Sequence, residues 1–289
     1  MIAPLSVPVA VIPAAGQGTR LYPLTLGTAK ELLPLGRYPA LVATLLEAEA
    51  AGVREIVIVT SKDKAGVRQF VERFPPLRDF HARVGIVEQP EPAGVLDAVA
   101  RGVAGIKEEG GTGIAVLFPD LVHLPDQTAL RRLTAAHAAC GAAVFGLRTV
   151  ERTETLGSTA VVCLQEPLLT PSALAEARAS GRPLRIVDVR AKEQCESGFP
   201  DGTRGELVTT FGQIQTPAFA QAVQARCRVA PSAPLADAHL LPALRDLASK
   251  GELYGVLLPG EILDLGTMPG YLHAATRFLT GTARLRGLP

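Results

Sequence analysis

Apolar strand patterns alternate with amphipathic helix patterns along the first half of the chain. Val7–Ile12 is a continuous apolar run, as expected for a strand that is buried on both faces. Ala40–Ala51 repeats leucine and alanine at helical spacing, and a β-branched strand follows at Val53–Thr60. The alternation continues with a helix from Ser61 to about Phe74, strands at Val84–Glu88, Gly113–Phe118 and Ala142–Arg148, and helices at Gly94–Ile106 and from Asp126 to about Gly141. This order predicts crossover connections and a mainly parallel sheet.

The second half of the chain is less regular. Strands are predicted at Ala160–Leu164, Leu184–Val189, Leu207–Gln215, Leu253–Leu258 and Glu261–Leu265, and helices at Pro217–Arg226, Ala236–Lys250 and Pro269–Leu279. No internal repeat, linker or abrupt change of composition separates the halves. We therefore expect one domain over residues 1–289, composed of two halves at about 1–150 and 151–289.

Composition excludes several classes of protein. The 289 residues are 47% hydrophobic and 20% charged, which excludes a disordered chain, and the formal net charge is only +1. The basic residues are scattered, so no nucleic-acid partner is predicted. No segment resembles a signal peptide or reaches the roughly 18–20 apolar residues of a membrane span. We expect a cytoplasmic protein without a membrane contact, whose four widely spaced cysteines are free thiols.

A glycine-rich loop with the sequence PAAGQGTR follows the first strand, at Pro13–Arg20. Small residues let backbone N–H groups approach an anion, and Arg20 adds a positive fork suited to phosphate. A dinucleotide fingerprint would need a small residue where Leu21 stands, and a Walker-type Gly-Lys-Ser/Thr is absent. Lys30, ten residues beyond Arg20, can neutralise the same phosphates.

Three segments carry a resemblance to a known family: IPAAGQGTRLYPLT, AKELLPLGRYPAL and EAAGVREIVIVTSKDK. They resemble the bacterial UTP–glucose-1-phosphate uridylyltransferases, within the sugar-1-phosphate nucleotidyltransferase family that also includes the glucose-1-phosphate thymidylyltransferases. The resemblance implies an α/β, Rossmann-like fold of the nucleotide-diphospho-sugar transferase type, with a mostly parallel or mixed sheet flanked by helices. It assigns the phosphates of the nucleoside triphosphate to Ala14, Ala15, Gly16, Gly18, Thr19, Arg20 and Lys30.

A further segment, QPEPAGVLDAV, begins at Gln89. A glutamine amide offers both a donor and an acceptor to a pyrimidine edge, and the segment resembles the family's base-recognition segment. Gln89 and Gly94 are therefore expected to contact the base. Asp97 stands at a position that varies in the family and receives no role. Gln89 can read uracil or thymine, so UTP is favoured over dTTP by resemblance only.

Two aspartates follow apolar strands, Asp120 in FPDL and Asp264 in EILDLGT. Two carboxylates brought together at strand ends form an oxygen site suited to Mg²⁺ on a nucleotide. The pair also matches the family's metal-binding aspartates. Arg20, Lys30, Asp120 and Asp264 are accordingly the predicted catalytic residues, with Mg²⁺ as the cofactor.

The resemblance assigns nucleotide binding to the half at about 1–150 and the sugar phosphate to the half at about 151–289. The sugar-phosphate side departs from the family pattern. Resemblance assigns Gly157 and Gly212 to it, but the family's Glu-Lys-Pro is missing, so Lys192 or Arg190 is expected to meet the phosphate. Pro119-Asp120-Leu121 also replaces the Gly-Asp-Asp or Gly-Asp-Asn of relatives. These differences leave the identity of the sugar 1-phosphate open.

The implied reaction is nucleotidyl transfer from UTP to a sugar 1-phosphate, with glucose 1-phosphate favoured, giving a nucleotide sugar and pyrophosphate. A thymidylyltransferase, an enzyme for another sugar-like 1-phosphate, and a non-catalytic nucleotide-binding homologue are the alternatives. By resemblance we expect a homo-oligomer, either a dimer or a tetramer.

Overall fold

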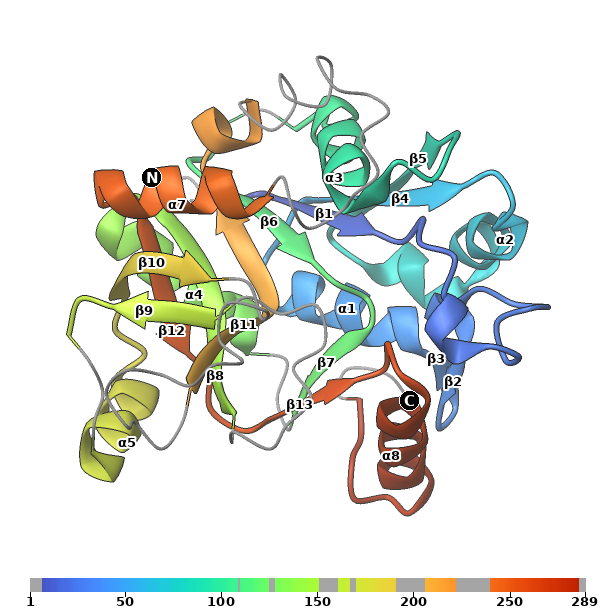
Figure 1. Cartoon of the computed structure of the whole chain (residues 1–289). Coiled ribbons are helices and arrows are strands. Elements are labelled where there is room, and N and C mark those ends of the chain that lie inside the picture. The colour runs from blue at the N-terminus through green and yellow to red at the C-terminus, as the bar shows by residue number, and fades with distance from the viewer. Residues whose placement is uncertain are drawn as a thin grey trace.

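A nine-stranded mixed sheet organises the chain (Figure 1). The computed structural model describes residues 7–108, 110–124, 128–150, 161–166, 170–190, 206–221 and 240–285. The strands lie in the order β5-β4-β1-β6-β11-β8-β12-β10-β9. Their bounds are β1 Val9–Pro13, β4 Glu55–Ser61, β5 Arg83–Gln89, β6 Ile114–Leu117, β8 Ala143–Val150, β9 Val161–Leu164, β10 Leu184–Arg190, β11 Glu206–Gln215 and β12 Leu253–Leu257.

The strands β5, β4, β1 and β6 are parallel and carry helices on both faces. The connecting helices are α1 Ala40–Ala50, α2 Ala65–Arg73, α3 Gly94–Ala104 and α4 Ala129–Cys140. Ile12 and Ile58 pack with α1, α2 and α4, whereas Val11 and Val57 on the opposite face pack with α3. Figure 1 shows α3 and α1 on opposite sides of β1. Burial on both faces explains why these strands are continuous apolar runs.

The second half of the sheet contains antiparallel strands. β11 runs antiparallel to both β6 and β8, and β10 runs antiparallel to β12 and β9. A pairing of Val208 with Val161 also joins β11 to β9, so the pairings from β11 through β8, β12, β10 and β9 form a closed ring. The helices α5 Pro171–Ser180 and α7 Leu240–Lys250 pack here, on a core that includes Ile186 and Leu257.

Two short antiparallel pairs complete the architecture. β7 Leu121–Leu124 pairs with β13 Glu261–Asp264, and β2 Pro34–Leu35 pairs with β3 Tyr38–Pro39. The last helix, α8 Met268–Leu279, contacts β13 and β2, and the Thr267 hydroxyl caps it by accepting a hydrogen bond from the Gly270 N–H. Short helical turns occur at η1 Thr19–Leu21, η2 Lys30–Leu32 and η3 Pro75–Asp79.

The structure confirms the α/β class, a helix-flanked mixed sheet and most of the predicted elements. The parallel pairing predicted from the first half holds for β5, β4, β1 and β6, whereas β9, β10 and β11 of the second half run antiparallel to their neighbours. β7 and α5 were not predicted, and the predicted helix ends at 222–226 and 236–239 lie outside the described residues. Within the described part of the chain, no helix is both long and apolar enough to cross a membrane. The single-domain assignment stays a prediction.

Candidate active site

The candidate site lies where the loops after β1 and β6 diverge. The connection from β1 through α1 leads to β4 on one side, whereas β6 lies on the other side of β1. A crevice outside the carboxyl ends of the strands at such a switch point is the usual ligand site of an open α/β sheet. The glycine-rich loop at 14–20 follows β1, and Pro119-Asp120 follows β6.

The glycine-rich loop is anchored at its base and exposed at its tip. Ala14 and Ala15 are buried, whereas Gly16, Thr19 and Arg20 are exposed; these are five of the predicted phosphate-binding residues. The loop continues into the single turn η1 rather than a long helix. The tip of the loop and the Arg20 guanidinium are therefore accessible to an anion, whereas the Ala14 N–H already donates to the Val59 carbonyl.

Gly18 joins this loop to the Lys30 segment. Its φ of +70° lies in the left-handed region, which favours glycine. A Cβ at this position would lie 3.3 Å from Thr25 Cγ2 and 3.4 Å from Lys30 Cβ, so the two segments are in close contact. The Thr25 hydroxyl also donates a hydrogen bond to the Gly18 carbonyl at 2.9 Å.

Lys64 supports the loop from behind and was missed at the sequence level. Its ammonium donates to the Ala14 carbonyl and to Glu31 Oε2, both at 2.8 Å. The Lys64 side chain is 10% exposed and the Glu31 side chain 0% exposed. Burial lowers the pKa of Lys64, although the Glu31 carboxylate opposes this effect. The sequence carries no local signal for this pair, because Lys64 and Glu31 are 33 residues apart.

Lys30 and Asp120 form an ion pair at the centre of the site, with Lys30 Nζ 2.5 Å from Asp120 Oδ2. Burial lowers the pKa of Lys30, but the Asp120 and Glu31 carboxylates outweigh it and leave this pKa raised. Burial raises the pKa of Asp120, but the Lys30 ammonium and then Arg20 outweigh it and leave this pKa lowered. Both members of the pair are therefore charged at neutral pH.

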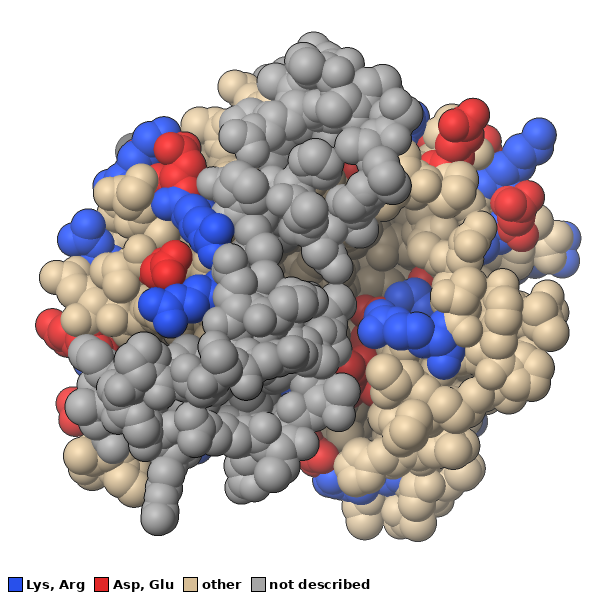
Figure 2. Space-filling model, in the orientation of Figure 1, with Lys and Arg blue, Asp and Glu red and all other residues tan. Residues whose placement is uncertain are grey.

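The two predicted metal ligands face one small residue, Gly266. A Cβ there would lie 3.0 Å from Asp264 Oδ1, 3.2 Å from Asp120 Oδ2 and 3.4 Å from Arg20 Nη2. Because both carboxylate oxygens are so close to the same point, Asp120 and Asp264 lie side by side at this position. Backbone bonds hold the arrangement, because the Leu265 N–H donates to the Asp120 carbonyl and the Gly266 N–H donates to Asp264 Oδ1, both at 2.7 Å. Figure 2 shows basic and acidic side chains gathered around a hollow near the centre of this face.

This arrangement of carboxylates fits a divalent cation. Among the described residues, no three or more His, Cys, Asp or Glu side chains form a cluster that could hold a metal ion alone. Two carboxylates with the remaining oxygens supplied by phosphates and water are the donor set that Mg²⁺ uses on nucleotides. Asp120 and Asp264 are the residues of the site that could hold such an ion.

Gln89, at the carboxyl end of β5, is buried and fixed by its neighbours. Its Nε2 donates to the Gly94 carbonyl at 3.0 Å and to Asp97 Oδ2 at 2.8 Å. Arg101 Nε in turn donates to Asp97 Oδ2 at 2.5 Å. The structure thus brings Gln89 and Gly94 together, as expected, and gives Asp97 a contact that the sequence did not predict.

The predicted sugar-phosphate residues are only partly described. Gly212 pairs with Leu117 of β6, and a Cβ there would lie 3.0 Å from Leu117 Cδ2 and from the Val116 carbonyl oxygen, so close strand packing explains this glycine. Arg190 ends β10 and donates to Asp188 Oδ2 at 3.0 Å. Gly157 and Lys192 lie outside the described residues.

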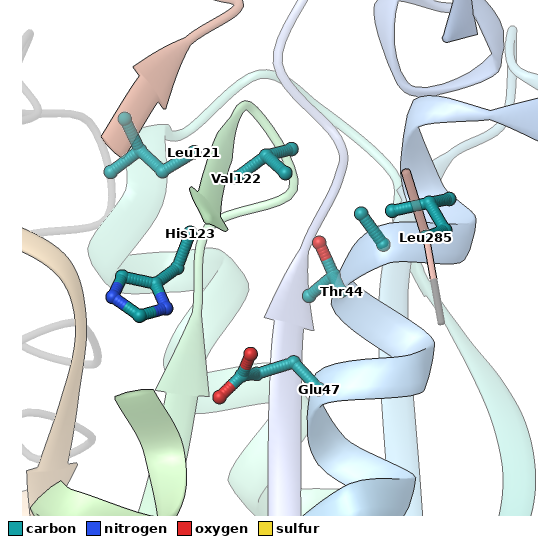
Figure 3. Close-up of a pocket in the computed structure, with 7 residues that line it drawn as sticks. Thr44, Glu47, Leu121, Val122, His123 and Leu285 are labelled. Atoms are coloured by element: carbon teal, nitrogen blue, oxygen red, sulfur yellow. The ribbon is translucent and has the colours of Figure 1, made fainter. Parts of the chain in front are cut away.

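A small cavity lies between α1 and β7 and is lined by Ala43, Thr44, Glu47, Leu121, Val122, His123 and Leu285. Figure 3 shows Thr44 and Glu47 on α1 facing His123 on β7. Glu47 Oε1 accepts a hydrogen bond from the Leu130 N–H at the start of α4, at 2.7 Å. Burial nevertheless raises the pKa of Glu47 to about 7.

Comparisons with known proteins agree with this geometry. The model of the nucleotidyl transferase family matches residues 9–161, more than half of the chain. The UTP–glucose-1-phosphate uridylyltransferase YngB of Bacillus subtilis (strain 168) is 25% identical over 286 residues, covering 92% of this chain and 88% of that relative. The glucose-1-phosphate thymidylyltransferase of Neisseria gonorrhoeae is 32% identical over 139 residues, 48% of this chain and 46% of that relative.

A crystal structure of UDP-glucose pyrophosphorylase complexed with UDP-glucose shares the fold. Its TM-score is 0.74 at 20% sequence identity, with 95% of this chain and 99% of that chain covered. The family model spans the glycine-rich loop, Gln89 and Asp120, whereas Asp264 and Gly266 lie outside its matched residues. The chain therefore belongs to the nucleotidyl transferase family.

Proposed function

We propose that this chain transfers the uridylyl group of UTP to glucose 1-phosphate, giving UDP-glucose and pyrophosphate. The observation that carries the proposal is the convergence of Arg20, Lys30, Asp120 and Asp264 beside the glycine-rich loop. The name of the Bacillus subtilis relative supports UTP and glucose 1-phosphate. The name of the Neisseria gonorrhoeae relative keeps dTTP as the alternative nucleotide.

The glycine-rich loop and two cations would bind the triphosphate. Backbone N–H groups from Ala15 to Thr19 can donate to phosphate oxygens, and the Arg20 guanidinium can bind two of these oxygens at once. An ammonium has three donors, and Lys30 uses one of them on Asp120. Lys30 can therefore contact a phosphate without releasing Asp120.

The reaction needs no nucleophile from the protein. An oxygen of the sugar phosphate attacks the α-phosphorus of UTP in line, and the bond from that phosphorus to the bridging oxygen breaks. Pyrophosphate leaves with the electron pair, so atoms and charge balance. The chain must hold two anions in line and offset their repulsion, which is the main task in phosphoryl transfer.

Asp120 and Asp264 would hold Mg²⁺ in this scheme. The ion would supply further positive charge to the phosphate oxygens when bound. The chain itself contributes the orientation of both carboxylates, because Lys30 fixes Asp120 and the Gly266 N–H fixes Asp264. Gly266 leaves the space between them free of a side chain.

The acceptor would be held by the second half of the chain. Gly157, Gly212 and either Arg190 or Lys192 are the proposed contacts with the sugar phosphate. Arg190 is already paired with Asp188, which orients the guanidinium but takes up part of its donor capacity. We therefore keep Lys192 as the favoured contact with the phosphate.

Pyrophosphate release from UTP, dTTP, CTP, ATP and GTP across a panel of sugar 1-phosphates with Mg²⁺ tests the proposal. UTP with glucose 1-phosphate is expected to give the fastest release. UTP binding without release from any pair would instead support the non-catalytic homologue. In Asp120→Asn and Asp264→Asn, release is expected to fall by about 10²-fold or more, while the secondary structure measured by circular dichroism stays unchanged.

Three further properties belong to the same proposal. A cytoplasmic location, where UTP is available, agrees with the substrates. A single domain over residues 1–289 agrees with the sheet, whose strands come from both halves. A homo-oligomer, a dimer or a tetramer, is proposed from the family resemblance, and light scattering of the purified chain measures it directly.

A further inference from the structure

The Gln89 amide is held along one edge by two acceptors. Its Nε2 donates to the Gly94 carbonyl and to Asp97 Oδ2, at 3.0 and 2.8 Å. A backbone carbonyl and a carboxylate can only accept, so the NH₂ group of Gln89 must face them. The orientation of this amide is therefore dictated by the chemistry of its partners.

The opposite edge of the amide carries an oxygen with open lone pairs. No residue in the described part of the chain donates a hydrogen bond to Gln89 Oε1. The residue is 3% exposed, so its amide is held within the packed end of β5. The group that Gln89 can offer to a ligand is thus an acceptor, because both N–H bonds are already used.

Asp97 is itself fixed in place. It lies in the first turn of α3, where the helix N-terminus favours a negative charge. Arg101, one turn further along α3, donates to the same Asp97 oxygen at 2.5 Å. The carboxylate that orients Gln89 is therefore held from two sides.

We propose that Asp97 is a specificity-determining residue: by fixing the Gln89 amide, it presents an acceptor to the base and selects uracil or thymine over cytosine. This inference rests on the proposed function and on the contact of Gln89 with the base that the family resemblance implies. Uracil and thymine carry an N–H at ring position 3, whereas cytosine carries an acceptor nitrogen there. With Gln89 Oε1 facing ring position 3, cytosine would set two acceptors against each other, with neither lone pair satisfied.

The full-length chain tests the inference through equilibrium binding of UTP and CTP by isothermal titration calorimetry. The parent is expected to prefer UTP by at least about tenfold, since an unsatisfied buried group costs about that factor or more. Asp97→Asn replaces an obligate acceptor by a side chain that can also donate, so only the Gly94 carbonyl still requires the NH₂ group of Gln89 and the amide is held less firmly in one orientation. The preference is then expected to fall to within about threefold of unity.

Two matched variants separate this role from loss of a surface charge. Asp246→Asn makes the same change on α7, where Asp246 also pairs with a cation four residues on, Lys250, and should keep the parent's preference. Arg101→Gln removes the ion pair but leaves the Asp97 acceptor, and should also keep most of the preference. An equal loss in Asp246→Asn or Arg101→Gln would overturn the inference.

Pyrophosphate release, measured in parallel, distinguishes this inference from the proposed function. A parent that prefers UTP over CTP in binding but releases no pyrophosphate refutes the function and leaves the role of Asp97 standing. An active parent whose UTP preference survives Asp97→Asn refutes the role of Asp97 alone. A parent that binds both nucleotides equally, or neither, also overturns it.

Discussion

Replacement of Lys64 by methionine tests whether the ion pair behind the glycine-rich loop supports nucleotide binding. Methionine keeps most of the side-chain volume but removes the ammonium, which bonds both Glu31 and the Ala14 carbonyl at 2.8 Å. Glu31 would then be buried without a partner, since its Oε1 already has none in the described structure. Breaking one side of a buried pair costs about 3–5 kcal/mol. That is a large part of a typical free energy of unfolding of about 5–15 kcal/mol.

A double variant separates stability from loop position. Lys64→Met combined with Glu31→Met replaces the pair by apolar side chains, a change that is often neutral or stabilising for buried ion pairs. We expect most of the free energy of unfolding to return. Nucleotide affinity should stay low, because the Ala14 carbonyl still lacks the donor that holds the base of the loop.

Equilibrium urea unfolding and calorimetric UTP binding measure the two effects. Lys62→Met is the matched control, because Lys62 is exposed on the same turn and should change neither quantity. A loss of less than about 1 kcal/mol in Lys64→Met would refute the energetic role of the pair. Recovery of both stability and UTP affinity in the double variant would refute the role of Lys64 in positioning the loop.

Three further changes have defined outcomes. Gly266→Ala puts a Cβ about 3 Å from Asp264 Oδ1 and close to Asp120, so pyrophosphate release should fall at least about tenfold, with little change in Tm; full activity would contradict the convergence at Gly266. Lys30→Met leaves the buried Asp120 carboxylate unpaired, so its pKa should rise and activity should fall about 10²-fold or more; a pH–rate profile measures both, and an unchanged profile would contradict the pair. Because burial raises the pKa of Glu47 from 4.5 to about 7, its contribution to stability is complete below pH 4.5 and is lost as pH rises through 7. Between pH 4.5 and 7 the parent should lose about 3 kcal/mol of its free energy of unfolding through Glu47, and Glu47→Gln should remove this loss. Tm measured against pH tests this, and equal slopes in parent and variant would show that Glu47 does not titrate there.

The sequence predicted those helices and strands whose buried positions form a recognisable local pattern of apolar residues. β1 and β4 are buried on both faces, so their apolar runs could be recognised without knowledge of the partners. α5 escaped prediction because it buries only Ala177 and therefore has no apolar stripe. β7 escaped because four residues form a strand there through pairing with β13, which lies more than a hundred residues further on.

The residues of the candidate site also differ in how far the sequence could predict them. The loop at 14–20, Lys30 and Asp120 belong to short motifs, and the structure brings them together. Lys64 and Asp97 look like ordinary surface charges in the sequence, because a lysine or aspartate near a helix start is usually solvated. Their roles depend on contacts with Glu31 and Gln89 that only the folded chain creates.

The proposed nucleotide side keeps the motifs of the family, whereas the proposed sugar-phosphate side departs from them, and the direction of the strands explains this difference. The nucleotide side is built from loops at the carboxyl ends of the parallel strands β1, β5 and β6, which share one edge of the sheet and so need only short motifs to meet. The proposed acceptor side draws on β10 and β11, whose antiparallel directions are set by pairing with neighbouring strands. In the proposed site, substitutions on these strands would alter the contacts with the sugar without moving the triphosphate. We therefore expect the choice of sugar 1-phosphate to differ between relatives more than the preference for UTP does.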